Sequence, residues 1–253
     1  TLIPAMIPPG TAHIHGVSSV GLPGDAATLV LVGGFTASLL HDFAVRAAPK
    51  STISASTLDR LPFVDDPALR SMILLRTLRV NCVTSAYSDL WECVFSGDFT
   101  NDSWTSGGHN YSDRPSLGEV TPHWTATTPL RRATDRRQAL LEVDTLVAIA
   151  LGIDVEELCA IYRTQFPVLL GYDLRALHYD QEGRVVPTSV LTRAQRLPAG
   201  DENTSLVGVH PGSGRQYTYA RPFKPLDREA DMRLAFDELR VRVAERRVDS
   251  VHL

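Results

Sequence analysis

Arginine side chains are the groups in this sequence most suited to binding a charged partner. Of the 25 cationic residues, only Lys50 and Lys224 are lysines. Four arginines surround the start of an expected helix: Arg131, Arg132, Arg136 and Arg137. Guanidinium groups bind phosphates through charge-assisted hydrogen bonds, and such contacts hold a nucleic acid without reading its sequence. The alternative is a solvated helix end at which these arginines pair with Asp135 and Glu142.

Histidines offer a second possible chemistry, which is metal binding. His13 and His15 lie two residues apart, so on a strand their side chains would point to the same face. A zinc site needs further ligands, and the candidates are His41, His109 and His123. Nothing in their spacing brings these side chains together, so we predict no metal site.

The sequence lacks motifs for catalysis. A methyltransferase that works alone needs a glycine-rich loop for its cofactor and a polar-Pro-Pro-aromatic motif for a flipped adenine. The only Pro-Pro pair, at residues 8–9, lies between Ile7 and Gly10, so it lacks both the polar and the aromatic side chain. A Gly-x-Ser-x-Gly elbow is also absent. We therefore predict that this chain is not an enzyme on its own and holds no cofactor.

The hydrophobic pattern predicts a predominantly helical α+β fold. Apolar residues recur at helical spacing in four stretches: residues 27–47, 65–95, 130–151 and 227–247. Asp154 is suited to cap a further helix, which Pro167 would end. Short strands are expected at the N-terminus, over residues 1–7 and 12–20, and a hairpin is expected near residues 177–191.

These elements predict four successive parts of the chain: residues 1–64, a long helix over 65–95, a loop over 96–129 and a helical C-terminal extension over 130–253. The loop is rich in Gly, Pro, Ser and Thr. Loops of this length are functional or disordered. Three large aromatic residues favour order in this one: Trp104, Tyr111 and Trp124.

The composition predicts a soluble, cytoplasmic protein without a membrane partner. Hydrophobic residues make up 43% of the chain, but no apolar run approaches the roughly 20 residues of a membrane helix. Three widely spaced cysteines are expected to be reduced and buried: Cys82, Cys93 and Cys159. The net charge of -4 differs from the basic excess of a free-standing nucleic-acid binder. Because the chain begins at Thr1 without a methionine, we expect it to be part of a longer protein.

Three segments of residues 1–64 carry a resemblance to a known family. TLIPAMIPPG at residues 1–10 is similar to an apolar strand that ends in a proline turn. LVLVGGFTASLLHDF at residues 29–43 is similar to a helix that usually contains a small Asn-Ser pair, which is Ala37-Ser38 here. LDRLPF at residues 58–63 is similar to a closing Leu-x-x-Leu-Pro motif. In this order they resemble the closing part of the target-recognition domain of type IIG-like adenine methyltransferases from restriction-modification and phage-defence systems.

The remaining chain resembles the long C-terminal extension of some actinobacterial-type members of this family, chiefly over residues 72–95 and 131–187. The resemblance implies a parent enzyme that transfers a methyl group from S-adenosylmethionine to adenine N6. Its implied partners are double-stranded DNA, an upstream methyltransferase domain and other defence-system subunits.

Within this chain, the resemblance implies DNA contacts by polar donors that lie at turns and element ends near the recognition segment. The candidates are His13, His15, Ser18, Arg46, Lys50 and Ser54. The four arginines of residues 131–137 are candidates for further phosphate contacts. The alternative function is a protein-interaction or scaffold module of a defence complex, which the acidic middle of the chain and its apolar helices favour.

Overall fold

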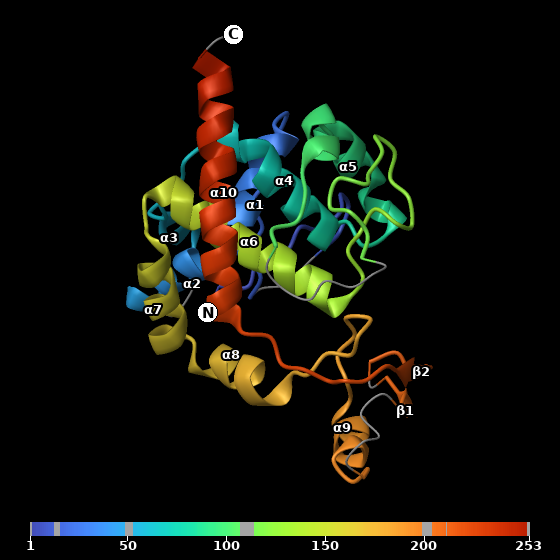
Figure 1. The fold of residues 1–253 in the computed structure, drawn as a ribbon. Coiled ribbons are helices and arrows are strands. Elements are labelled where there is room, and N and C mark those ends of the chain that lie inside the picture. Colours follow the sequence, from blue (N-terminus) through green and yellow to red (C-terminus); the bar gives the residue numbers. More distant parts are fainter. Residues whose placement is uncertain are drawn as a thin grey trace.

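The computed structural model describes residues 2–12, 16–48, 53–106, 114–198, 204–210 and 212–251. Ten α-helices and one antiparallel two-stranded sheet form the regular structure of these residues, apart from short 3-10 and π turns, which confirms the predominantly helical α+β class. Figure 1 shows a helical body, which we define as the described residues before 177 and after 226. A smaller unit, the arm (residues 177–226), projects from it.

Three long helices pack at the centre of the body: α4 (Pro67–Asn81), α6 (Ala133–Leu151) and α10 (Arg228–Val251). Each contributes fully buried apolar side chains, among them Met72, Leu146 and Leu239. Burying one such side chain stabilises a fold by roughly 1.5–3 kcal/mol. The three helices therefore form the main apolar core, against which the shorter helices pack.

The expected helix over residues 27–47 is instead two helices, α1 (Ala26–Thr36) and α2 (Leu39–Ala47), which meet at an angle of 67°. The break lies at Ser38, whose hydroxyl caps α2. Gly34 brings α1 close to α4, since a Cβ atom there would lie 2.6 Å from Thr77 Oγ1. Among the described residues no single helix is long and apolar enough to cross a membrane, although α1 and α2 meet the length and composition criteria as a bent pair.

The single long helix expected over residues 65–95 is wrong, because the chain turns after Asn81. The segment forms α4 and then α5 (Ser88–Val94), joined through a short 3-10 turn at Ser85–Tyr87. Carbonyl groups in the last turn of α4 accept the backbone N–H of Leu130 and the guanidinium of Arg136, each at 2.8 Å. These contacts satisfy carbonyls that a continuing helix would otherwise have used.

The two strands expected near the N-terminus are wrong for the part of that segment that the structure describes. Its backbone groups bond to side chains of the body instead. Leu2 N–H donates to Asp42 Oδ1 at 2.8 Å and Met6 N–H donates to Asn81 Oδ1 at 3.2 Å. The hydroxyl of Tyr87 donates to Met6 O at 2.9 Å. A strand needs a neighbouring strand for its hydrogen bonds, and side chains fill that role here.

Residues 96–129 are largely irregular where they are described, as predicted, apart from a 3-10 helix at Gly97–Asn101. The indole N–H groups of Trp104 and Trp124 each donate to a backbone carbonyl, at 3.0 and 2.9 Å. Tyr111 lies outside the described residues. Trp124 therefore ties the loop to Cys82 at the end of α4, and Trp104 joins two parts of the loop to each other.

The capping prediction at Asp154 is confirmed. Its carboxylate accepts the N–H of Glu157 at the start of α7 (Val155–Gln165), and the Glu157 carboxylate accepts the N–H of Asp154. Pro167 ends α7 as predicted and begins α8 (Pro167–Gly171). A π-helical turn at Tyr172–Ala176 then leads into the arm.

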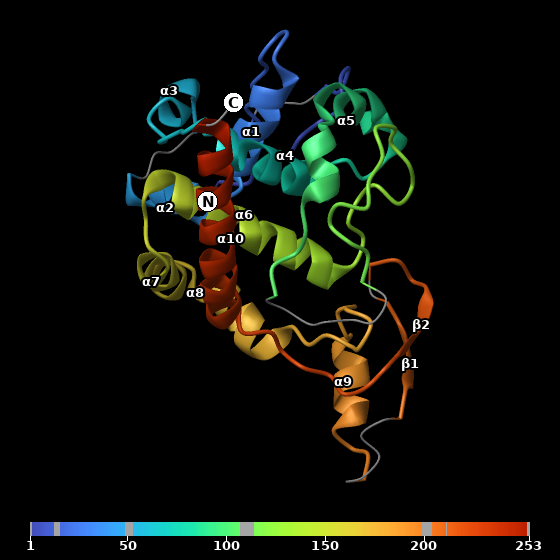
Figure 2. The same ribbon diagram turned by 45° about the horizontal axis from the view of Figure 1, so that its top comes forward.

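The arm contains one helix and the two strands of the sheet: α9 (Thr188–Ala194), β1 (Leu206–Val209) and β2 (Gln216–Tyr219). Figure 2 shows from a second direction that these elements extend away from the helical body. The hairpin expected near residues 177–191 is reduced to one bridge, between Tyr179 and Val185, before α9 begins. The sheet therefore forms further along the chain than predicted.

The cysteines are free, and two of the three are buried as expected. Burial raises the pKa of the Cys82 thiol to about 12 and that of Cys159 to about 11. Cys93 is exposed, which corrects the expectation that all three lie in the core. It lies on α5, whose buried face is formed by Trp91 and Val94.

Candidate nucleic-acid interface

Two of the serines predicted to contact DNA come together at one exposed corner of the body. Ser18 Oγ donates to Ile53 O at 3.1 Å, which brings it next to Ser54. Ser54 immediately precedes α3 (Ala55–Leu58). We call these two segments the serine corner: residues 16–22 and 53–58. Hydroxyl groups at turns and helix starts are common donors to phosphate oxygens, so this corner has side chains suited to contact the phosphate backbone of DNA.

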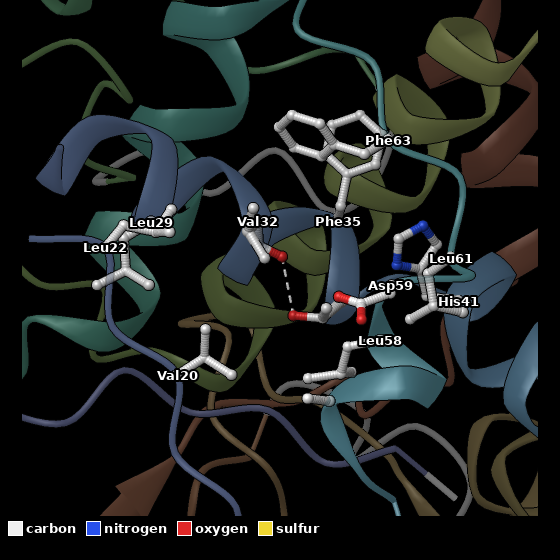
Figure 3. Close-up of a pocket in the computed structure, with 12 residues that line it drawn as sticks. Val20, Leu22, Leu29, Val32, Phe35, His41, Leu58, Asp59, Leu61 and Phe63 are labelled. Atoms are coloured by element: carbon white, nitrogen blue, oxygen red, sulfur yellow. Dashed lines mark hydrogen bonds between the residues drawn. The ribbon is translucent and has the colours of Figure 1, made fainter.

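An apolar hollow of about 260 Å³ lies beside the serine corner. Figure 3 shows Val20 and Leu58 on its corner side and Phe35 with Phe63 across from them. The two phenyl rings lie 5.1 Å apart between centroids. Concave, mostly apolar sites with few polar groups are typical of binding pockets. Sequence reasoning did not predict the hollow, because its lining comes from segments that are separated in sequence and read individually as helix or turn.

His41 is the buried polar group in the wall of this hollow. It is only 2% exposed, and its Nε2 donates to Pro62 O at 2.8 Å. Burial lowers the pKa of His41, although the bond to Pro62 raises it in part. The ring is therefore neutral at physiological pH, and Nδ1 is left as a buried acceptor without a partner among the described residues. His41 thus lines the hollow and does not offer a cation to DNA.

Arg46 is held by the body instead of standing free for DNA. Its Nη2 donates to Asp42 Oδ2 at 2.9 Å and its Nη1 to Gln165 O at 3.2 Å. The guanidinium also lies 4.5 Å from the centre of the Phe166 ring. These contacts connect α2 to the end of α7. Three further candidates, His13, His15 and Lys50, lie outside the described residues.

The four arginines near the start of α6 do not form one phosphate-binding face. Arg137 is buried, with its Nη1 donating to Asp231 Oδ2 at 2.6 Å, and Arg136 donates to Val80 O in the last turn of α4 and to Leu130 O. Arg131 is exposed and donates to Ala126 O at 3.1 Å, while Arg132 is partly exposed. Arg131 is therefore the most exposed of the four, and Arg132 and Arg136 are partly exposed.

Exposed apolar side chains are concentrated in residues 1–64. They include Ile3, Ile7, Val17, Val20 and Phe63. Groups of exposed apolar residues mark surfaces that contact another macromolecule. Val20 and Phe63 line the hollow, and Val17 and Val20 belong to the serine corner, so this part of the chain offers both polar donors and exposed apolar side chains.

The described residues contain no group of three or more His, Cys, Asp or Glu side chains placed to hold a metal ion. No protein-family model, curated protein or solved structure matches this chain.

Proposed function

We propose that this chain is the DNA-contacting part of an adenine-N6 DNA methyltransferase of a restriction or phage-defence system. In this proposal an upstream methyltransferase domain binds S-adenosylmethionine and performs the methyl transfer, in the cytoplasm. The chain itself has no catalytic role. It grips the duplex, and it docks against the catalytic domain through the apolar surface of residues 1–64.

One observation carries the proposal. Ser18 and Ser54, both predicted from the sequence as DNA contacts, lie 36 positions apart in sequence, and the bond from Ser18 to Ile53 O brings them together at the exposed serine corner. Ser18 uses its hydroxyl hydrogen on Ile53 O, so it acts as a positioning residue that holds the two segments together. Ser54 is exposed, and its Oγ lies 3.0 Å from Ser56 Oγ and 3.4 Å from Thr57 Oγ1 at the start of α3. In the proposal its hydroxyl accepts from one of these neighbours and donates to a phosphate oxygen.

A scaffold function is the second candidate, and the exposed apolar side chains of residues 1–64 favour it. In that case the serine corner would be incidental and the hollow would receive a side chain of another subunit. The two candidates differ in their response to salt. Contacts with DNA phosphates weaken steeply as salt rises, because binding releases condensed counterions.

The test measures binding of the 253-residue chain to a fluorescein-labelled duplex over a series of salt concentrations. Loss of one hydrogen bond costs about 0.5–1.5 kcal/mol, so Ser54→Ala is expected to weaken binding about two- to tenfold. Ser54→Thr keeps the hydroxyl and should restore the affinity. Ser85→Ala, at an exposed serine of the body outside the corner, is the matched control.

Salt-sensitive binding that Ser54→Ala weakens and Ser54→Thr restores would support the proposal. Equal affinities for the wild type, Ser54→Ala and Ser85→Ala would remove the serine corner as a DNA contact. A wild-type chain that binds no duplex even at low salt would favour the scaffold function.

A further inference from the structure

The two strands of the arm form a ribbon with one buried and one exposed face. Leu206 and Tyr219 lie opposite each other and face α9, where they pack with Val190 in the small core of the arm. Gly208 allows this close packing, since a Cβ atom there would lie 2.3 Å from a methyl carbon of Val190. Side chains alternate along a strand, so the neighbouring pairs must point away from the arm.

The exposed face of the ribbon combines apolar and amide side chains. It consists of the opposite pairs Val207 with Thr218 and Val209 with Gln216. Val207 is 42% exposed and Val209 is 59% exposed. A methyl-bearing side chain can contact the methyl group of thymine, and a glutamine can pair with the edge of adenine. A two-stranded ribbon also fits the width of the DNA major groove.

Arginines occupy the outer edges of both strands. Arg193 Nη1 donates to Val207 O at 2.7 Å along β1, and Arg184 Nη2 donates to Thr218 O at 2.6 Å along β2. These are carbonyls that an added peptide strand would need for pairing. The two arginines therefore hinder strand addition by a protein partner. Arg193 also places positive charge beside β1, whereas the charge of Arg184 is balanced by Asp180 and Glu182.

The turn between the strands adds two more donors. His210 N–H donates to Arg215 O at 2.8 Å, so these residues continue the ribbon beyond Val209 and Gln216. The His210 ring accepts backbone N–H groups at Nδ1, from Gly212 and Ser213 at 3.2 and 3.1 Å. Its remaining nitrogen, Nε2, therefore carries the hydrogen and is free of these turn contacts. Arg215 is exposed beside it.

The charge of the arm is opposite to that of the remaining chain. The arm carries six arginine or lysine residues and four acidic residues, a net charge of +2, while the remaining chain carries 19 and 25, a net charge of -6. Two of the acidic residues of the arm, Asp180 and Glu182, form ion pairs with Arg184 inside the arm. The other two, Asp201 and Glu202, lie outside the described residues. A basic projection on an acidic body is suited to a polyanion.

We infer that the exposed face of this ribbon enters the major groove of duplex DNA, while Arg193, His210 and Arg215 contact the phosphates on either side. Val207, Val209 and Gln216 then face the base edges. This surface lies on a different part of the chain from the serine corner and does not depend on the corner's binding DNA. In the parent enzyme of the proposed function, the ribbon would be a second contact with the same duplex.

The test compares two valine-to-glutamate variants of the 253-residue chain in binding to a labelled duplex of mixed sequence. Val209→Glu puts a carboxylate on the groove face, and we expect at least tenfold weaker binding. Val241→Glu makes the same change on α10, where the valine is 54% exposed, and should leave the affinity unchanged. Both positions are exposed, so neither variant is expected to impair folding, which circular dichroism checks.

A third variant, Arg215→Gln, measures the phosphate contact. Each phosphate contact adds about 0.9 to the slope of log affinity against log salt, so this variant should lower the slope by about that amount. Wild-type affinity in Val209→Glu, or an equal loss in Val241→Glu, would overturn the inference. So would displacement of the duplex by polyglutamate as effectively as by unlabelled DNA, because an acidic protein would then serve equally well.

The same measurements separate this inference from the proposed function. If Ser54→Ala binds normally while Val209→Glu does not, the ribbon contact stands and the serine corner falls. If Ser54→Ala weakens binding while Val209→Glu and Arg215→Gln do not, the opposite holds.

Discussion

The body and the arm use arginine in opposite ways. In the body, guanidinium groups are buried and join distant elements, as Arg76 and Arg137 do. In the arm, Arg193 and Arg215 are exposed and surround a small ribbon. The buried arginines of the body therefore hold its fold together, while the exposed arginines of the arm are available to a ligand. A count of cationic residues does not distinguish these roles, because the distinction lies in burial.

Arg76 is the centre of the buried network in the body. It is fully buried, with its Nη1 donating to Asp102 Oδ2 at 2.6 Å and its Nε to Glu142 Oε2 at 2.7 Å. Burial opposes its charge, but the two carboxylates together raise the pKa of Arg76 above its ordinary value. Glu142 also accepts the N–H and hydroxyl of Thr105. The network thus fixes the irregular segment after residue 101 to α4 and α6.

Removing Arg76 is expected to have the largest effect on the body. Arg76→Ala leaves two carboxylates buried without their cation, and breaking such a pair costs roughly 3–5 kcal/mol. The free energy of unfolding, measured by urea titration with circular dichroism, should fall by that amount. Arg70→Ala is the control, since Arg70 pairs with the exposed Asp65 and such pairs contribute only about 0–1 kcal/mol. Equal losses of unfolding free energy in the two variants would contradict the idea that the buried arginine stabilises the fold more than the partly exposed one does.

The positions of the helices could be predicted from the sequence better than the roles of the arginine side chains. Apolar spacing locates α6 and α10, and the capping pattern at Asp154 locates the start of α7. These signals depend only on residues that are close together in the sequence, so they can be recognised without a structure. The break after Asn81 depends on Leu130 and Arg136, which lie far along the chain. A break imposed by a distant segment leaves no local pattern.

The candidate site was predictable only in part, for a related reason. Ser18 and Ser54 could be chosen as polar residues at turns, but their meeting depends on a hydrogen bond between two distant segments. The ribbon of the arm was missed because β1 and β2 have only four residues each. Strands this short give little alternation to detect. The burial of Arg137 was equally hidden, because its partner Asp231 lies on α10.

Asp144 provides a test of the body through pH. It is buried, which raises its pKa to about 7, although Arg228 and the N–H of Leu39 oppose the increase. The folded form keeps this proton up to about pH 7, while the unfolded chain loses it near pH 4. The free energy of unfolding should therefore fall as pH rises between those values.

Asp144→Asn removes this titration and keeps an oxygen acceptor for Leu39. Between pH 5 and pH 7 the wild type should lose roughly 2 kcal/mol more of its unfolding free energy than the variant, at about 1.4 kcal/mol per pH unit. Urea titrations at several pH values measure the difference. Parallel pH profiles for the two proteins would show that Asp144 has an ordinary pKa in the folded protein.

A matched pair of glycine substitutions compares the packing of the two regions. Gly34→Ala forces a Cβ atom to within 2.6 Å of Ile73 and Thr77 in the body, and Gly208→Ala forces one to within 2.3 Å of Val190 in the arm. Overpacking of this kind costs about 1–3 kcal/mol. Gly34→Ala should lower the urea midpoint of the whole protein. Gly208→Ala should leave that midpoint nearly unchanged and weaken duplex binding, because only the ribbon shifts.

The smallest expected effect is that of a substitution in the core of the arm on the stability of the body. All three cysteines lie in the body, so the labelling rate of buried Cys82 with a thiol reagent reports opening of the body alone. Leu146→Ala in the main core is expected to cost about 2–5 kcal/mol and to accelerate this labelling at least tenfold. Leu206→Ala, in the small core of the arm, should leave the rate unchanged.

Exposed Cys93 reacts first in every variant and serves as the internal reference. Hydrogen exchange at the amides of β1 and β2 would confirm that Leu206→Ala has loosened the arm. Acceleration of Cys82 labelling by Leu206→Ala would mean that the two regions open as one cooperative unit. An unchanged rate with a loosened ribbon would instead mean that the arm can shift on DNA while the body keeps its structure, since local opening then costs less than global unfolding.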